Sequence, residues 1–499
     1  MSDAAQDPNG LPALRERYGP RYRWLLLLAV MVGTMASIMS STIVNVAIPD
    51  MSQHFTLGQE RAQWVSSAFM AAMTVSMLTT PWLLARYGYR RTYEGCMWLL
   101  LVGGVAGGLA NDYPLVLAAR VAEGLAAGVV QPIPAIIILR AFDSTEQGRA
   151  SGIFGMGVVL APALGPSIGG VLVDWFGWRS IFFMVVPLCV VSLWLAKKLI
   201  PTTAPGGGAA NRDGAGLDWR GLLIASLGTL CLLNGLVELQ GGTAATALTL
   251  LAAAVGLLVA FIWLERRTLQ QRRRHPSQGV DPLLDLTLFR DRRFAMGSIV
   301  AFIYGIALFG STYLLPVYMQ MGLRLSPSVV GTVLLPAGFV LAVTIAVVGR
   351  LADRQPTHRL VSIGLLMLAA SFALMVTIRL DHAGLIIPLL ILWAILGRIG
   401  LGFVLPSLNI GAMRGLDRSH IPQGSSAINF LRMLGGAAGV SLCGIFLEWR
   451  LAAHGQVLDS ASRAPDRLAA FNETFILLAV ICGVALIAAL RLKADSRTQ

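Results

Sequence analysis

Residues 155–172, GMGVVLAPALGPSIGGVL, decide the fold of this chain. The stretch holds five glycines and two prolines but no charge, and it lies inside a longer apolar run. In water it would make a poor helix, because an interior Gly costs about 1 kcal/mol and an interior Pro about 3 kcal/mol. In a bilayer, backbone groups must pair internally, and neighbouring helices satisfy those that Pro frees. The stretch therefore predicts a membrane-spanning helix.

Small residues recur at every fourth position of this predicted helix. Such a stripe lets a second backbone approach closely, and ordinary close packing in any helical membrane protein explains it. The spacing GPxxGG, followed by WRSIF at residues 178–182, favours a more specific motif. The stripe and the residues beside it are Gly157, Ala161, Pro162, Gly165, Pro166, Gly169 and Gly170.

The composition agrees with a polytopic membrane protein. Of 499 residues, 56% are hydrophobic and only 13% are charged, which lies outside the range of soluble globular domains. The apolar run 24–48 is too long for the core of a signal peptide, so we interpret it as an uncleaved first span. The net charge of +13 belongs to cytoplasmic loops rather than to a nucleic-acid surface. Five cysteines within or beside apolar runs, without a CxxC pair, favour neither a disulfide framework nor a metal site.

Apolar runs of about 20 residues predict fourteen spans. They begin near residues 24, 62, 93, 114, 150, 179, 219, 244, 294, 328, 358, 384, 424 and 472. We expect a cytoplasmic segment at 1–23, a six-helix half at 24–200, a linker at 201–217, two additional transmembrane helices at 218–265, a basic cytoplasmic connector at 266–293, a second six-helix half at 294–492 and a cytoplasmic tail at 493–499.

The distribution of positive charge predicts the orientation. With the N-terminus inside, 29 of the 39 Lys and Arg residues fall on the cytoplasmic side, seven fall on the other side, and three lie within spans. This bias places both termini in the cytoplasm. The basic run QRRRH at residues 271–275 is either a solvated loop that obeys this bias or an interfacial amphipathic helix on anionic lipid.

An internal repeat relates the two halves. Arg86 and Arg354 follow the second and tenth spans, and Arg120 in the fourth span corresponds to Arg398 in the twelfth. The glycine pair 165 and 169 corresponds to the pair 435 and 439. The offsets are 268, 278 and 270 residues, which indicates two parallel six-span halves with two inserted helices.

Charged residues inside spans are costly and are therefore functional candidates. Arg120 and Glu123 are three residues apart, on one helical face. They either form a structural ion pair, or Glu123 takes up and releases a proton while Arg120 changes partner. Uncharged polar residues are by default hydrogen-bonding groups between helices. As candidates for lining a substrate cavity we take Ser40, Asn45, Gln131, Arg398, Asn429 and Arg432.

Absent motifs exclude several enzyme classes. No GxxxxGK[ST] loop is present, so direct ATP hydrolysis is excluded, and no HExxH motif occurs. All six histidines fall in predicted loops, which disfavours a membrane-embedded hydrolase or acyltransferase. We expect a protein that is not an enzyme and that holds no metal.

Several segments together resemble a known family. Residues 41–49 read STIVNVAIP, residues 63–65 read QWV, and residues 120–124 read RVAEG, similar to an R-x-x-Q-G motif. GPSIGG at 165–170, WRSIFFMVVP at 178–187, and QGSS at 423–426 with LGG at 434–436 complete the pattern. Over residues 24–490 the chain resembles the fourteen-span drug:proton antiporter branch of the major facilitator superfamily, the EmrB/QacA-like proteins.

This resemblance implies an all-α major facilitator fold with fourteen transmembrane helices and alternating access between the two halves. It implies that the glycine stripe bends its helix and limits proton leak, and that Arg120 takes part in proton coupling. The residues of the gating loops after the second and tenth spans are then Arg86, Gly88, Arg90, Arg91, Gly349, Asp353 and Arg354.

The sequence departs from the pattern of this branch at three places. The branch often carries Asp in the first span where this chain has Ser40, and Gln in the fourth span where it has Glu123. The loop after the second span has Pro81 and Ala85 where the general motif has Gly and Asp. We hypothesise that Glu123 assumes the protonation role vacated at Ser40.

By the same resemblance we expect a multi-pass exporter in a bacterial inner membrane. It would use no cofactor, only the proton gradient, and would move drugs or other amphipathic organic compounds, as in multidrug efflux and antibiotic resistance. Its partners would be a small-molecule substrate and the lipid bilayer, without nucleic acid; some relatives also use a periplasmic adaptor and an outer-membrane channel. The alternatives are export of an anionic metabolite or siderophore, an uncoupled facilitator or importer, and a receptor built on the same fold.

Overall fold

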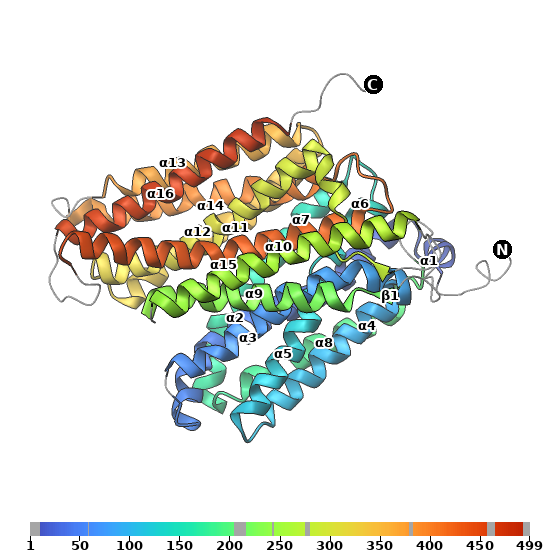
Figure 1. Ribbon diagram of the computed structural model, residues 1–499, viewed down its shortest axis with the longest axis horizontal. Helices are drawn as coiled ribbons and strands as arrows, with labels where there is room; N and C mark the ends of the chain where they lie inside the picture. Colours follow the sequence, from blue (N-terminus) through green and yellow to red (C-terminus); the bar gives the residue numbers. More distant parts are fainter. Residues whose placement is uncertain are drawn as a thin grey trace. The chain divides into compact units, whose positions relative to one another are not determined.

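The computed structural model describes residues 10–57, 59–203, 216–241, 244–274, 280–378, 383–456 and 465–492, and most of them are helical (Figure 1). The α-helices up to residue 199 are α1 (Leu11–Tyr18), α2 (Tyr22–His54), α3 (Gln59–Ser76), α4 (Thr80–Gly108), α5 (Tyr113–Val130), α6 (Ile133–Ala141), α7 (Gln147–Phe176) and α8 (Ser180–Leu199). They are followed by α9 (Trp219–Gly241), α10 (Ala244–Arg274), α11 (Arg292–Val317), α12 (Pro327–Ala352), α13 (Thr357–Met375), α14 (Ala383–Met413), α15 (Ile421–Ala453) and α16 (Pro465–Leu490). The shorter elements are η1 (Gly19–Arg21), η2 (Met77–Thr79), η3 (Leu286–Arg290), η4 (Tyr318–Gly322), β1 (Gly216–Leu217) and β2 (Val280–Asp281).

Most of these helices suit a bilayer. The described residues contain twelve stretches that are long and apolar enough to cross a membrane. One of them, Arg61–Gly108, is 48 residues long and comprises α3 and α4. The 30-residue helix α7 covers the fifth predicted span, which those twelve do not include. The prediction of an all-α polytopic protein is therefore confirmed.

Gly88 divides α4 into two helices. Its backbone has φ 79° and ψ 171°, a region that is open almost only to Gly. The residues before Gly88 complete the second predicted span, and those after it form the third. A single glycine thus separates the second span from the third, and no loop lies between them.

The chain divides into two compact units. Unit 1 comprises Met1–Ser226, Leu258–Leu286 and Leu416–Ala427, and unit 2 comprises Leu227–Leu257, Thr287–Gly415 and Ile428–Gln499. The helices α9, α10 and α15 each contribute residues to both units.

In unit 1, α2 packs against α3, α5, α7 and α8, and α5 also packs against α3 and α4. The Tyr93 hydroxyl joins three of these helices, because it bonds the carbonyl of Ala29 on α2 at 3.0 Å and lies 2.8 Å from the hydroxyl of Ser192 on α8. Tyr93 is fully buried in an apolar core that includes Leu26 and Leu100. Its hydroxyl thus has its hydrogen-bonding needs met inside the core.

In unit 2, α14 packs against α11, α12 and α13, and α16 packs against α11 and α13. Aromatic rings fill the space between α16 and its neighbours. Phe475 stacks on Phe372 of α13 at 6.5 Å and meets the edge of Tyr318 at 5.2 Å between ring centroids. Burial of such rings is a large contribution to packing.

The segments that flank α9 and α10 also meet. Gly216 pairs with Val280 and Leu217 with Asp281 in a two-residue parallel ladder, which the all-helical prediction did not include. The basic residues 271–274 extend α10 and are not a separate interfacial helix, and the residues of this run beyond 274 lie outside the described part. The ladder holds the start of α9 beside the segment that follows α10.

Candidate functional site

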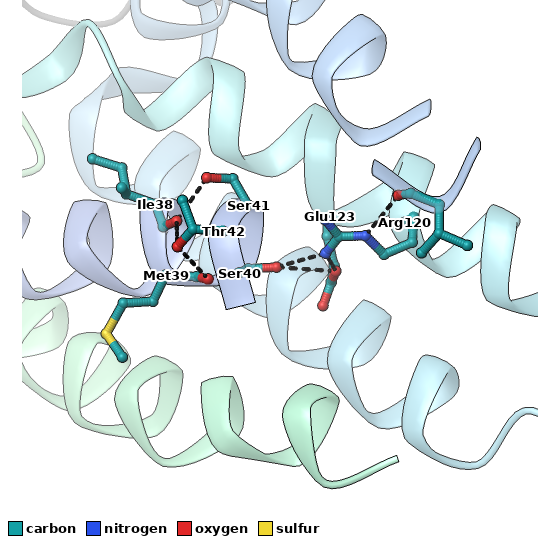
Figure 2. A network of polar contacts seen from close by, with 8 residues as sticks. Ile38, Met39, Ser40, Ser41, Thr42, Arg120 and Glu123 are labelled. Carbon is teal, nitrogen blue, oxygen red and sulfur yellow. Dashed lines mark hydrogen bonds and ion pairs between the residues drawn. The ribbon is translucent and has the colours of Figure 1, made fainter. Parts of the chain in front are cut away.

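A buried ion pair lies on α5 in unit 1. Arg120 and Glu123 are 1% and 0% exposed, and Arg120 Nη1 donates to Glu123 Oε2 at 2.5 Å (Figure 2). Their separation of three residues puts both side chains on the same face of the helix. The predicted pair is thus formed.

Ser40 of α2 completes a triad with this pair. Arg120 Nη1 donates to Ser40 Oγ at 2.8 Å, and Ser40 Oγ donates to Glu123 Oε2 at 3.1 Å (Figure 2). Ser40 itself is 1% exposed. The structure therefore brings together two of the positions at which the sequence departs from the pattern of the branch that it resembles, although they are 83 residues apart.

Helix α3 holds the other side of the Arg120 guanidinium. Arg120 Nε donates to the Val65 carbonyl at 3.1 Å, and the Phe69 ring lies 4.2 Å from the guanidinium carbon. A cation over an aromatic face is attracted by the ring quadrupole. These two contacts fix Arg120 independently of its carboxylate partner.

Glycines of α4 make the space that Glu123 occupies. A Cβ on Gly103 would lie 2.7 Å from Glu123 Cγ, and a Cβ on Gly104 would lie 3.0 Å from the Phe182 carbonyl oxygen and 3.6 Å from Glu123 Oε1. Two polar atoms of the pair, Glu123 Oε1 and Arg120 Nη2, are buried without a hydrogen-bond partner among the described residues. Oε1 is the atom on which a proton can reside, because Oε2 already accepts from Ser40 and Arg120.

The remaining cavity candidates of unit 1 lie apart from the triad. Asn45 is exposed on α2, and Gln131 lies in the break between α5 and α6. Neither is hydrogen-bonded to Arg120 or Glu123.

In unit 2 the structure places two arginines near one phenol. Arg432 Nη2 donates to Asn429 Oδ1 at 2.7 Å, one turn away on α15. The charges of both Arg432 and Arg398 act on the hydroxyl of Tyr304 on α11, a residue that the sequence reasoning missed. Among the described residues no carboxylate forms an ion pair with Arg398. Unit 2 therefore holds positive charge without a counterpart of Glu123.

The glycine stripe of α7 lies against α2. A Cβ on Gly157 would lie 2.8 Å from Met31 Sδ, one on Gly165 would lie 2.8 Å from Thr42 Oγ1, and one on Gly169 would lie 2.6 Å from Ile43 Cγ1. Gly170 has open space, so it lies off this face. Pro162 and Pro166 lie inside the same helix. The predicted close approach of a second backbone is present, within unit 1.

The predicted gating residues lie in two separate places, and the loop expected after the second span is wrong, because its residues lie within α4 on either side of the break at Gly88. In unit 1, Arg90 binds Glu94 at 3.1 Å and the Lys197 carbonyl at 2.6 Å, Arg86 lies over the Trp82 ring, and Arg91 is exposed. In unit 2, Gly349 is buried near the end of α12, Asp353 is its C-cap, and Arg354 is exposed.

Two buried carboxylates outside the triad were not predicted from the sequence. Asp218 is 6% exposed at the start of α9, and Glu265 is 0% exposed on α10. Asp218 stands before an apolar run, where an N-cap is expected, and this was a signal in the sequence. Glu265 carried no such signal, because it directly precedes two arginines that suggest a solvated face. Among the described residues no group of three or more His, Cys, Asp and Glu side chains is arranged to hold a metal ion.

Comparisons with known proteins agree with this architecture. Residues 30–440 match the Major Facilitator Superfamily model. The chain is 28% identical over 469 residues to a multidrug resistance protein B homolog of Mycobacterium tuberculosis (strain ATCC 25618 / H37Rv), covering 91% of this chain and 82% of that one. It is 25% identical over 467 residues to the riboflavin transporter RibZ of Clostridioides difficile (strain 630), covering 94% and 97%.

A solved structure shows the same fold. The human organic anion transporter MFSD10 (TETRAN) superposes with a TM-score of 0.62 at 13% identity, over 94% of this chain and 99% of that one. The family match covers most of the chain, and the structural match covers nearly all of it. This chain is a member of the major facilitator superfamily, a family of membrane transporters.

Proposed function

We propose that this protein is a proton-coupled antiporter of the fourteen-span EmrB/QacA-like branch, which exports amphipathic organic compounds across the inner membrane. The observation that carries the proposal is the buried triad of Ser40, Arg120 and Glu123. It places one ionisable carboxyl inside the helix bundle of unit 1, where a change of charge has a large energetic effect.

The triad gives a means of coupling. When Glu123 is ionised, it holds Arg120 through the 2.5 Å contact. Protonation at Oε1 removes the charge that attracts Arg120, while the Val65 carbonyl and the Phe69 ring still bind the guanidinium. Taking up a proton therefore loosens the link between Arg120 and Glu123 without releasing Arg120 from α3. Such a change in partner biases the equilibrium between two conformations of the bundle.

The alternative role of the pair is purely structural. A structural ion pair in a membrane interior satisfies its polar atoms, because an orphaned buried atom costs about 1–3 kcal/mol. Here one carboxylate oxygen and one guanidinium nitrogen have no hydrogen-bond partner among the described residues. These two atoms without hydrogen-bond partners favour a site that changes its protonation, rather than an ion pair with a purely structural role.

The names of relatives support the proposed substrate class. Several bear names that state multidrug resistance, and another is named a riboflavin transporter. These names support an amphipathic organic substrate that is larger than an inorganic ion. The proton-motive force is sufficient, since one charge moved through 100 mV yields about 2.3 kcal/mol. The excess of Lys and Arg supports a cytoplasmic location of both termini.

A second candidate, export of an anionic metabolite or siderophore, is favoured by one observation. Arg398 and Arg432 place two positive charges near Tyr304 in unit 2. Anionic compounds therefore belong in any panel of test substrates. An uncoupled facilitator or importer differs only in lacking the role of Glu123.

The test is transport in proteoliposomes under an imposed proton gradient. The panel contains lipophilic cations, amphipathic anions and riboflavin, with the wild type beside Glu123→Gln and the control Glu238→Gln on α9. We expect substrate movement that collapses with a protonophore and with Glu123→Gln but not with Glu238→Gln. Movement that persists with the protonophore in the wild type would show a facilitator and would overturn the proposal.

A further inference from the structure

Two buried carboxylates lie near one another where α9 begins and α10 ends in unit 1. Asp218 is the residue before α9, and its Oδ1 accepts the Gly221 amide at 2.8 Å. Glu265 lies on α10, and its Oε2 accepts the amide of Leu284, in the segment after α10, at 3.4 Å. The ladder between β1 and β2 holds these two chain segments together. All of these residues belong to unit 1.

The second oxygens of the two carboxylates point to one place. A Cβ on Gly221 would lie 2.8 Å from Asp218 Oδ2 and 2.9 Å from Glu265 Oε1. Both oxygens are buried and have no hydrogen-bond partner among the described residues. Since Gly221 has no side chain, only its hydrogen atoms face these two acceptors.

No cation within the described part of the chain pairs with either carboxylate. Among the described residues neither carboxylate takes part in an ion pair. Arg272 of α10 binds Asp281, and His420 lies 3.7 Å from Asp285. Asp285 adds a third acid near Glu265. Two buried like charges with orphaned oxygens would be strongly unfavourable, whereas one proton between them removes a charge and pairs both oxygens.

We propose that Asp218 and Glu265 form a second proton-binding site, in which protonated Glu265 donates from Oε1 to Asp218 Oδ2. Asp218 is the acceptor in this pair, because its Oδ1 already caps the N-terminus of α9. Glu265 takes the proton, because it is fully buried. A divalent metal does not fit, since no described group of three or more ligands surrounds the pair.

This site links protonation to the segment 280–286. The Oε2 atom of neutral Glu265 is a carbonyl oxygen that receives the Leu284 amide. Loss of the proton at high pH leaves the charges of Asp218, Glu265 and Asp285 close together. Their repulsion weakens the packing of this segment against α10. A cavity of about 450 Å³, lined by Leu269, Leu283, Asp285 and His420 among others, borders this segment.

Other titrating groups on this segment act in a different way. Burial raises the pKa of the Asp281 carboxyl, and the Arg272 guanidinium opposes that shift. Protonation of Asp281 at low pH therefore weakens its pair with Arg272. The pH at which this segment loosens therefore distinguishes the two effects. Deprotonation of Glu265 acts at high pH, whereas protonation of Asp281 acts at low pH.

Infrared difference spectroscopy of the full-length protein tests the protonation directly. The carboxylic C=O band of neutral Glu265 should be present in the wild type and lost in Glu265→Gln, and it should be retained in the control Glu238→Gln. Asp218→Asn should shift that band, because it replaces the charged acceptor of the proton by an amide. Absence of a C=O band that depends on Glu265 would show an ionised side chain and overturn the proposal.

Hydrogen–deuterium exchange of residues 280–286, corrected for the intrinsic pH dependence of exchange, tests the link to this segment. Protection should fall at alkaline pH in the wild type and in Glu238→Gln, and it should persist in Glu265→Gln, which keeps the neutral form. Equal pH dependence in the wild type and Glu265→Gln would contradict the link. Neither measurement involves transport, so this proposal stands or fails separately from the proposed function.

Discussion

Positions 40 and 123 share one hydrogen-bond network, and its carboxylate stands at position 123. In the branch that the sequence resembles, position 40 is often Asp and position 123 is Gln, whereas this chain has Ser40 and Glu123. Their side chains are 3.1 Å apart and both contact Arg120 Nη1. The network therefore places one carboxylate beside the arginine.

Gly88 gives a prediction for a single residue. With φ 79° and ψ 171°, a side chain at this position is strained by about 1–3 kcal/mol. Gly88→Ala should lower the unfolding temperature of the detergent-solubilised protein. Gly95→Ala, on the same helix and with open space for a Cβ, should leave it unchanged or raise it. Equal effects of both substitutions would show that the break at Gly88 does not depend on glycine.

At the level of helices, glycines of α7 and of α15 each lie close against a neighbouring helix. Gly169 of α7 faces Ile43 of α2, and Gly439 of α15 faces Ile306 of α11. A Cβ on Gly169 would meet a side-chain carbon first, whereas a Cβ on Gly439 would lie 2.5 Å from the Ile306 carbonyl oxygen. A side chain can move aside more readily than a backbone.

The two stripes therefore predict graded destabilisation. Gly169→Ala should cost about 1 kcal/mol and Gly439→Ala about 3 kcal/mol, the range for overpacking. Gly170→Ala, which meets nothing within 4 Å, should have no cost. Thermal unfolding of the three variants measures the order. A Gly170→Ala variant as unstable as Gly439→Ala would contradict the packing role of the stripes.

The sequence predicted the helices well, but it predicted fewer of the contacts between side chains of different helices. Apolar runs and the spacing of Gly165 and Gly169 predicted the spans and their close contact, because both depend on local periodicity. The contact of Ser40 with Glu123 was not predictable as a distance, since it depends on how α2 and α5 pack. The pairing of Asp218 with Glu265 was missed, because Glu265 stands before two arginines and its burial is set by the segment 280–286.

At the level of the whole molecule, the two units differ in how their buried arginines are paired. Arg120 in unit 1 is bound to Glu123, whereas its counterpart Arg398 in unit 2 has no carboxylate partner among the described residues. The repeat thus keeps the arginine and omits the acid. We infer that unit 1 provides the proton site and unit 2 provides positive charge for substrate selection.

This asymmetry predicts different effects of charge removal. Arg398→Gln should lower transport of amphipathic anions by about tenfold, which corresponds to the loss of about 1.4 kcal/mol of binding, and should leave transport of lipophilic cations unchanged or raised. Parallel uptake assays with one substrate of each charge measure the ratio. An equal loss for both substrates would indicate a structural role for Arg398.

Proton movement that accompanies substrate exchange tests the role of Glu123 most directly. A pH-sensitive dye inside proteoliposomes would report protons moved on addition of substrate, in the wild type, Glu123→Gln and the double variant Ser40→Asp with Glu123→Gln. The account predicts proton movement in the wild type, none in Glu123→Gln, and recovery in the double variant, because Asp at position 40 again places a carboxylate beside Arg120. Wild-type proton movement in Glu123→Gln would contradict it.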